Sequence, residues 1–223
     1  MKRKSSGTPT APISVPLSQE ELLKLLQRLD TQLADRPGRV VQLVGPSRGC
    51  GVSTIASALA EVALKSVREP VLLVDGDCEH PTHEAMLKLR CPHSLPDMIR
   101  DHLSLADTIV PIAGTELSLA VLAKTPAPRG EAIPIHILEQ ILVQIRQAFR
   151  WAIIDSAPAF ASSDTTALFR HVDATIVVIE AENTRIPVAQ QLLADIKANG
   201  GNPAGIVVNK RQFHIPSAIY RRL

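Results

Sequence analysis

The feature that most constrains the fold is a series of short aliphatic runs that alternate with predicted helices. Runs of Val, Ile and Leu without polar alternation are typical of strands that are buried on both faces of a parallel sheet. The predicted strands are residues 40–44, 71–74, 117–122, 151–154, 174–179 and 205–208. The predicted helices between them are residues 54–67, 94–102, 135–149 and 188–199. This alternation predicts a single α/β domain built on a doubly wound, mostly parallel sheet.

A further helix is predicted before the first strand, over residues 18–34. Its apolar face consists of four leucines at helical spacing, which are Leu22, Leu26, Leu29 and Leu33. Ser18 and Glu21, three residues apart, match a capping box at the start of this helix. We expect the leucines to pack on their own domain, and the alternative is that they bind a partner.

The two ends of the chain lack a periodic apolar pattern. Residues 1–17 are rich in Ser, Thr, Pro and Lys and are predicted to be a flexible tail. Residues 211–223 are predicted to be a short basic C-terminal tail, which either docks on the domain or touches a partner or a membrane surface. The domain is therefore expected to span residues 18–223.

Composition excludes several functional classes. The chain has 223 residues, with 24 Lys and Arg against 22 Asp and Glu, and this balance argues against binding nucleic acid through bulk charge. Four Phe, one Trp and one Tyr are too few for a surface that stacks bases. Three cysteines without a CxxC pair argue against a disulfide-rich secreted protein. Since the sequence has neither a signal peptide nor an apolar run of about 18 residues, we expect a cytoplasmic protein with no transmembrane segment of its own.

A glycine-rich loop follows the first predicted strand, with the sequence GPSRGCGVST at residues 45–54. Gly49 and Gly51 allow the backbone to approach an anion, and the N-terminus of the next helix directs unpaired N–H groups at it. Ser53 is placed to offer a hydroxyl to Mg²⁺, as in a P-loop. The lysine of a P-loop is absent, because Val52 stands at its position. Phosphate binding is the favoured interpretation, and a purely structural turn is the alternative.

Acidic residues end two of the other predicted strands. Asp75 and Asp77 follow residues 71–74, and Asp155 follows residues 151–154. Ligands of doubly wound sheets bind at the carboxyl ends of the strands, so these carboxylates are expected near the phosphate loop. There a carboxylate is able to hold a Mg²⁺-bound water or to accept a proton from a hydroxyl nucleophile. The alternative is that Asp75 caps a helix in a strand-to-helix turn.

Together these motifs resemble those of the bacterial tyrosine kinases (BY-kinases) of capsule and exopolysaccharide synthesis, which belong to the MinD/ParA-like branch of P-loop NTPases. The resemblance rests on the glycine-rich loop, VLLVDGD, WAIIDSAP with Asp164 and Asp173 downstream, and GIVVNK. It runs from about residue 18 to the C-terminus. It implies a domain that binds ATP or ADP with Mg²⁺. It also implies a membrane chain-length determinant (a polysaccharide co-polymerase) as partner, a location at the inner face of the plasma membrane, and a homo-oligomer.

The resemblance also assigns roles to individual residues. It implies Mg²⁺-binding positions at Ser53, Asp75 and Asp155, and catalytic positions at Asp75 and Asp77. It implies nucleotide-binding positions at Gly49, Gly51, Ser53, Thr54 and Asn209, with Thr54 on phosphate and Asn209 on adenine. The candidate phosphoacceptor is Tyr220, the sole tyrosine of the chain.

Two departures from the family pattern lie near the phosphates. Val52 replaces the phosphate-loop lysine, and Arg48 is the candidate that would reach the phosphates instead. Glu79 and His80 stand where the family usually has basic residues. Loss of one preorganised cation on a transferring phosphoryl group typically lowers the rate by about 10²–10³-fold.

Two further departures lie at the ends of the domain. Glu21, Lys24 and Gln27 only echo the Glu-x-x-Arg-x-x-Arg oligomerisation motif, and Tyr220 stands alone where the family has a tyrosine cluster. We therefore expect a BY-kinase-like regulator with a degraded kinase apparatus, that is, a pseudokinase. The alternatives are a MinD/ParA-type ATPase that positions a secretion or partition apparatus, and an active protein-tyrosine autokinase.

A group of Cys and His residues is the remaining candidate site. Its members are Cys78, His80, His83, Cys91 and His93. Side chains of these types bind zinc, but their spacing matches no zinc template. We do not expect a metal there.

Overall fold

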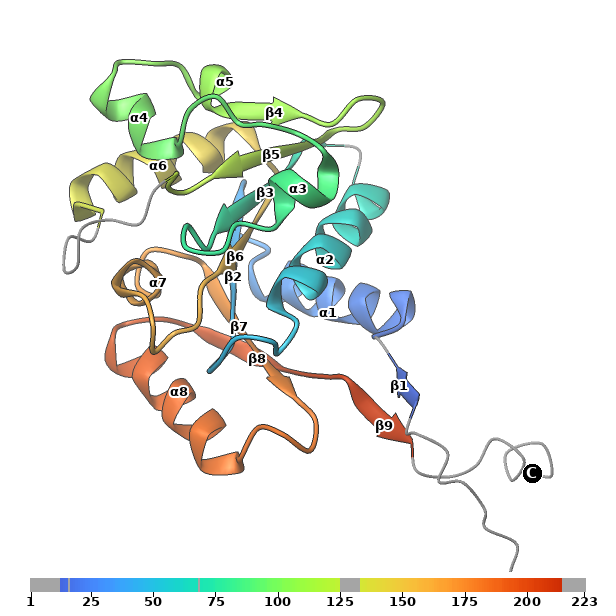
Figure 1. Ribbon diagram of the computed structural model, residues 1–223. Coiled ribbons are helices and arrows are strands. Elements are labelled where there is room, and N and C mark those ends of the chain that lie inside the picture. The colour runs from blue at the N-terminus through green and yellow to red at the C-terminus, as the bar shows by residue number, and fades with distance from the viewer. Residues whose placement is uncertain (1–12, 16, 68, 125–132, 214–223) are drawn as a thin grey trace, which may run out of the picture.

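The computed structural model describes residues 13–15, 17–67, 69–124 and 133–213. Its main feature is a seven-stranded sheet with the strand order β4-β5-β3-β6-β2-β7-β8 (Figure 1). The strands are β2 (Arg39–Val44), β3 (Val71–Gly76), β4 (Ile109–Pro111), β5 (Leu117–Val121), β6 (Trp151–Ser156), β7 (Ala174–Glu180) and β8 (Pro203–Asn209). Neighbouring strands are parallel except β4 and β5, which are antiparallel. The predicted α/β fold with a doubly wound, mostly parallel sheet is confirmed.

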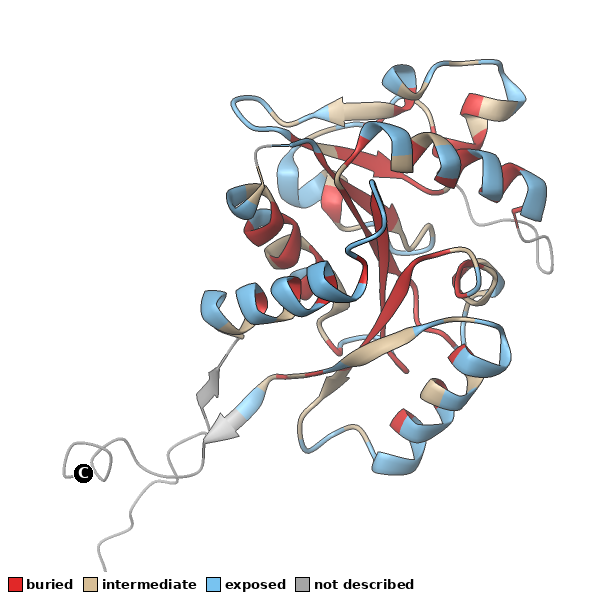
Figure 2. Ribbon diagram, turned by 180° about the vertical axis from the view of Figure 1, so that it is seen from behind, coloured by how far each residue is buried: buried red, intermediate tan, exposed pale blue. Residues whose placement is uncertain are grey.

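Helices cover both faces of the sheet. The helices on one face are α1 (Gln19–Gln32) and α2 (Val52–Ser66), and those on the other are α4 (Leu95–Arg100), α6 (Ile135–Ala148), α7 (Ser163–Leu168) and α8 (Ile186–Ala198). Successive residues of β2 face opposite layers, since Val41 packs with the first pair of helices and Val40 with α4 and α6. Figure 2 shows the result, with the strands largely buried and the outer sides of the helices exposed.

Several short elements were not expected from the sequence. These are α3 (His83–Leu87), α5 (Leu105–Thr108), β4 and α7, together with β1 (Ile13–Val15) and β9 (Arg211–Phe213), which form an antiparallel pair. Elements of three to six residues are too short to show a hydrophobic period, so the pattern of the sequence does not reveal them. Strands β1 and β9 fall within the two predicted tails, of which residues 1–12 and 214–223 lie outside the described residues.

Helix α1 begins with the expected capping box between Ser18 and Glu21. The four leucines of the predicted apolar face are buried in the same core as the apolar face of α2, and Leu29 is only 1% exposed. The predicted packing of α1 on its own domain therefore agrees with the structure. The alternative, in which the leucines bind a partner, is wrong, because the core already covers them.

The amino ends of the strands make close contacts with the end of α6. Gly38 lies just before β2, and a Cβ there would stand 2.1 Å from the carbonyl oxygen of Arg146 and 2.7 Å from that of Phe149. Close by, the Asp173 carboxylate accepts a hydrogen bond from the Val40 N–H at 2.7 Å. It also pairs with the Arg146 guanidinium at 3.1 Å. Asp173 therefore stabilises the amino end of β2, at the opposite end of the strand from the glycine-rich loop.

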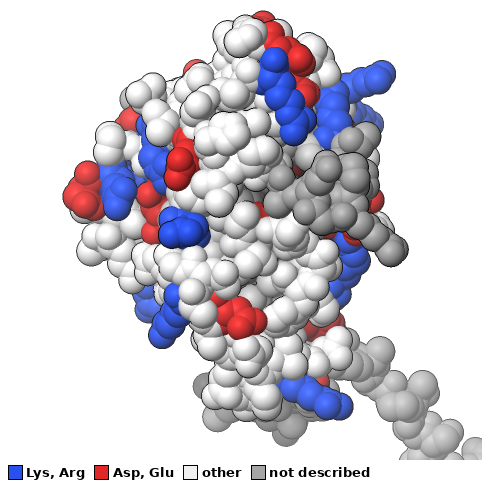
Figure 3. Space-filling view, turned by 90° about the vertical axis from the view of Figure 1, so that its left-hand side faces the viewer, with Lys and Arg blue, Asp and Glu red and all other residues white. Residues whose placement is uncertain are grey.

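Charged side chains are mixed on the surface. Figure 3 shows one face, on which Lys and Arg lie near Asp and Glu in small groups separated by uncharged surface. Within the described ranges, no helix is long and apolar enough to cross a membrane.

Candidate functional site

The glycine-rich loop connects the carboxyl end of β2 to the start of α2. Gly49 and Gly51 have φ angles of +85° and +90°, a region that side chains other than glycine rarely occupy. Gly51 is the N-cap of α2, and no side chain caps the first N–H groups of this helix. These N–H groups are therefore available to an anion at the loop, and the helix dipole adds to the attraction.

The first turn of α2 carries Val52 and two predicted site residues, Ser53 and Thr54. Val52 is half-buried and packs against the core, with its Cγ2 only 3.1 Å from where a Cβ on Gly45 would stand. The position of the P-loop lysine is thus filled by an apolar side chain directed at the loop backbone. Ser53 is half-buried and Thr54 is exposed, and both follow directly in the first turn. Their hydroxyls remain the predicted partners of a phosphate or a metal ion.

Asn209, at the end of β8, closes the loop from the other side. Its buried side chain donates a hydrogen bond from Nδ2 to the carbonyl oxygen of Cys50 at 3.0 Å. The same Nδ2 would be 2.1 Å from a Cβ on Gly51. Asn209 therefore positions the loop backbone in this structure, and its predicted contact with adenine stays a prediction.

Asp75, at the end of β3, is 2% exposed and accepts three backbone hydrogen bonds. Its Oδ2 accepts from the N–H of Thr82 at 2.9 Å and of His83 at 3.0 Å, and its Oδ1 accepts from the N–H of Asp77 at 3.3 Å. Burial raises the pKa of this carboxyl, and the hydrogen bond from His83 opposes the rise. Because Thr82 and His83 begin α3, Asp75 has the helix-capping role that the sequence left as an alternative.

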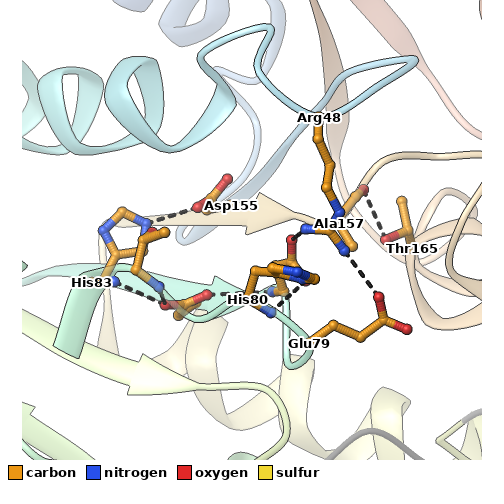
Figure 4. Close-up of polar contacts among 10 residues, drawn as sticks. Arg48, Glu79, His80, His83, Asp155, Ala157 and Thr165 are labelled. Atoms are coloured by element: carbon orange, nitrogen blue, oxygen red, sulfur yellow. Dashed lines mark hydrogen bonds and ion pairs between the residues drawn. The ribbon is translucent and has the colours of Figure 1, made fainter. Parts of the chain in front are cut away.

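The carboxylate of Asp155, at the end of β6, is paired with a histidine. The Nε2 atom of His83 lies 2.9 Å from Asp155 Oδ2, and Nδ1 of the same ring lies 3.3 Å from Ser57 Oγ. His83 is completely buried, and Asp155 is 1% exposed. Figure 4 shows the contact between their side chains. Sequence analysis placed His83 only among the weak metal candidates. Nothing in the sequence indicates this pairing, because the two residues are brought together only by the order of β3 and β6 in the sheet.

Arg48 extends from the loop to the segment after β3, as Figure 4 shows. Its Nη1 lies 2.6 Å from Asp77 Oδ2, and its Nη2 lies 2.9 Å from Glu79 Oε2. Arg48 was predicted to contact phosphate, and Asp77 was predicted to be catalytic. In this structure the two side chains form an ion pair with each other. Glu79, which stands where the family usually has a basic residue, is the second carboxylate that pairs with Arg48.

The Cys and His group does not form a metal centre. Among the residues that the structure describes, no three His, Cys, Asp or Glu side chains are placed to hold a metal ion. His83 is committed to Asp155, and Cys91 is buried beside the carbonyl oxygen of Leu119.

The thiols of Cys91 and Cys78 are expected to differ in reactivity. Burial raises the pKa of Cys91 to about 11, so only about 0.1% of it is thiolate at pH 8. Cys78 is half-buried, and burial also raises its pKa. Iodoacetamide at pH 8 should label Cys78 slowly and Cys91 only after unfolding, as peptide mapping by mass spectrometry would show. Equal labelling of both thiols in the native protein would contradict this expectation.

Comparison with known proteins supports the resemblance seen in the sequence. No family model matches the chain. It is 22% identical over 193 residues to the tyrosine-protein kinase ptk of Acinetobacter johnsonii, and 22% identical over 178 residues to the putative tyrosine-protein kinase CapB of Staphylococcus aureus. These matches cover 86% and 80% of this chain, but 26% of the first relative and 78% of the second. The chain thus spans about a quarter of the longer kinase.

Solved structures give the same result for the fold. The chimerical protein CapA2B2 superposes with a TM-score of 0.74 at 20% identity, over 86% of this chain and 84% of that one. The kinase domain of the Escherichia coli tyrosine kinase ETK has a TM-score of 0.74 at 18% identity, over 86% and 74%. The MinD cell division protein of Aquifex aeolicus has a TM-score of 0.63 at 18% identity, over 83% and 72%. The chain is therefore similar in sequence to bacterial tyrosine kinases and has the fold that their kinase domains share with MinD, with Val52 at the position of the P-loop lysine.

Proposed function

We propose that this chain is a nucleotide-binding regulator of exopolysaccharide or capsule synthesis that has the fold of a BY-kinase and does not itself phosphorylate tyrosine. The observation that carries the proposal is the contrast between the loop and its side chains. The loop backbone keeps the positive φ angles and the uncapped N-terminus of α2 that a phosphate requires. The side chains that would perform phosphoryl transfer are either replaced, as at Val52, or bound to other groups of the chain.

The proposed ligand is ATP or ADP. Its phosphates would lie on the backbone N–H groups of the loop and the start of α2, with the hydroxyls of Ser53 and Thr54 beside them. Arg48 is the one basic residue of the loop sequence and would supply the cation that Val52 does not. In the structure its guanidinium is held by two carboxylates, so nucleotide must compete with these for it.

Replacing Glu79 with glutamine should tighten nucleotide binding. The change removes one of the two carboxylates that hold Arg48, and the pair is partly exposed, with Arg48 at 40% and Glu79 at 53%. A pair of this kind is worth up to about 1 kcal/mol, so the expected gain in affinity is about two- to fivefold. Titration calorimetry with ADP measures it. Glu20→Gln, which breaks an exposed ion pair with Lys24 on α1, is the matched control. Weaker binding by Glu79→Gln would show that Arg48 does not serve the phosphates.

The purified protein is expected to show no tyrosine phosphorylation. Tyr220 is the only tyrosine, and it lies outside the described residues. Asp75, the residue proposed to accept the hydroxyl proton, is engaged by backbone N–H groups of Asp77, Thr82 and His83. The test is incubation with labelled ATP, beside the variants Tyr220→Phe and Asp75→Asn. Label that appears in the parent and is lost in both variants would establish an active autokinase instead.

The proposed partner is a membrane-anchored chain-length determinant, which would hold the protein at the inner face of the membrane. Since Leu22, Leu26 and Leu29 are buried, the contact would have to use the outer face of α1, where Leu23, Lys24 and Gln27 are exposed. The same face is where a second copy would bind in a homo-oligomer. Co-purification of the two proteins after joint expression tests the partner. The double variant Lys24→Glu and Gln27→Glu should reduce the yield of the co-purified partner. An unchanged yield would show that this face of α1 is not the contact.

A MinD/ParA-type ATPase is the second candidate function, and the fold match to MinD favours it. Such a protein would dimerise on ATP and return to monomer on hydrolysis. Light scattering during ATP turnover distinguishes the two functions. ATP-dependent dimers that disappear as phosphate is released would replace the proposed regulator with this ATPase.

A further inference from the structure

One buried histidine contacts both carboxylates that the sequence assigns to Mg²⁺. The His83 ring lies 2.9 Å from Asp155 Oδ2 through Nε2, and the backbone N–H of the same residue donates to Asp75 Oδ2 at 3.0 Å. The second ring nitrogen is 3.3 Å from Ser57 Oγ, one helical turn beyond Ser53 on α2. Both carboxylates and the ring are buried, and His83 has no exposed surface.

These contacts do not fit a magnesium site. Mg²⁺ requires near-octahedral oxygen ligands and usually keeps several waters, so its carboxylate ligands need free oxygen atoms. Asp75 uses both of its oxygens for backbone N–H groups, and Asp155 uses one for His83. Across the described ranges, no group of three acidic, His or Cys side chains is placed to hold a metal ion.

The backbone that carries the ring is also held in place. His83 is the first residue of α3, a five-residue helix whose start is fixed to Asp75 through the N–H groups of Thr82 and His83 itself. If Asp155 turned to a metal ion, the imidazole would remain buried with only the hydroxyl of Ser57 as partner. A buried polar group that loses its partner is unfavourable, so the pairing resists the ion.

We infer that His83 excludes a divalent cation from the Asp75–Asp155 pair, so that the chain takes its nucleoside phosphate in the metal-free form. The ligand class rests on the proposed nucleotide binding, but the exclusion of the cation does not. Beside the loop, Asp77 and Glu79 both pair with Arg48 in this structure.

The first test measures ADP affinity by calorimetry in excess EDTA and in excess MgCl₂. The wild type should bind ADP more weakly in MgCl₂ than in EDTA, because Mg²⁺ binds ADP in solution and the site takes only the metal-free form. In His83→Asn, Mg²⁺ should tighten binding about tenfold or more. Ser57→Ala removes the other partner of the ring without touching a carboxylate, so it is the matched control and should behave as the wild type. Tighter binding of ADP by the wild type in MgCl₂, or no tightening in a folded His83→Asn, would overturn the inference.

A second test needs no nucleotide. Mn²⁺, a paramagnetic substitute for Mg²⁺, is titrated into the full chain and bound ion is followed by electron paramagnetic resonance. The wild type should bind no Mn²⁺ at this site. His83→Asn and His83→Ala should each gain a bound ion. Adding Asp155→Asn to either variant should remove that ion. If the wild type binds no ADP in either buffer, the proposed function fails, and the Mn²⁺ titration alone decides whether His83 excludes the cation. Bound Mn²⁺ in the wild type that Asp155→Asn removes, or no gain in either folded His83 variant, refutes the exclusion.

Discussion

Replacing Gly51 with alanine is expected to abolish nucleotide binding, and the same replacement at Gly49 is expected to weaken it far less. Both glycines have φ near +90°, so both changes introduce comparable backbone strain of about 1–2 kcal/mol. Only at Gly51 does the new methyl group also meet an obstacle, since it would lie 2.1 Å from Asn209 Nδ2. At Gly49 nothing lies within 4 Å of it.

The obstacle at Gly51 cannot be relieved without moving the loop. Asn209 is buried, and its Nδ2 holds the carbonyl oxygen of Cys50, the residue before Gly51. Displacing this side chain releases the loop backbone that would bind phosphate, so we expect a loss of ADP affinity of 100-fold or more for Gly51→Ala, about the factor that nearly 3 kcal/mol represents. Calorimetric titration of both variants measures the difference. If both lose affinity equally, positive φ alone accounts for the effect and Asn209 has no part in holding the loop.

Replacing Gly38 with alanine is expected to destabilise the whole domain. The new Cβ would lie 2.1 Å from the carbonyl oxygen of Arg146 and 2.7 Å from that of Phe149, and backbone atoms at the end of α6 cannot move aside as a side chain can. Overpacking of this kind typically costs about 1–3 kcal/mol, and a contact with backbone on two sides places Gly38→Ala at the upper end. The free energy of unfolding in urea gives the value directly.

Gly205 provides the matched control for Gly38. It lies in β8, and nothing stands within 4 Å of a Cβ added there. Gly205→Ala should therefore change the free energy of unfolding by no more than about 0.5 kcal/mol. Similar losses of stability in both variants would mean that the close contact between Gly38 and the end of α6 does not account for the loss.

The order of strands and helices could be predicted because each strand is a continuous apolar run. The ends of the strands could not, since hydrogen bonding continues after the apolar residues stop. Strand β3 was predicted to end at Val74 but extends to Gly76, which lies opposite Ser156 of β6. Parallel pairing with a neighbour decides this length, and the neighbour lies far away in the sequence.

The position of the candidate site was predictable for a similar reason. In a parallel sheet the carboxyl ends meet at one edge, so Asp75 and Asp155 were expected together, and their strands are paired there. The partners of these carboxylates were not predictable. His83 contacts Asp155 from α3, a helix too short to give a hydrophobic pattern in the sequence. Arg48 contacts Glu79 because the glycine-rich loop lies beside the segment that follows β3. Such contacts depend on side-chain placement, which no spacing in the sequence encodes.

Strand order also determines when the site is made during synthesis. The loop-bearing strand β2 lies between β6 and β7, with Val41 opposite Ile153 and Val44 opposite Val177. Ribosomes add about 5–20 residues per second, so the loop leaves the ribosome on the order of ten seconds before the strands that flank it. Throughout that interval the nascent chain contains the glycine-rich motif without the sheet that positions it. A fragment that ends before β6 is therefore expected to carry the complete loop sequence and no formed binding site.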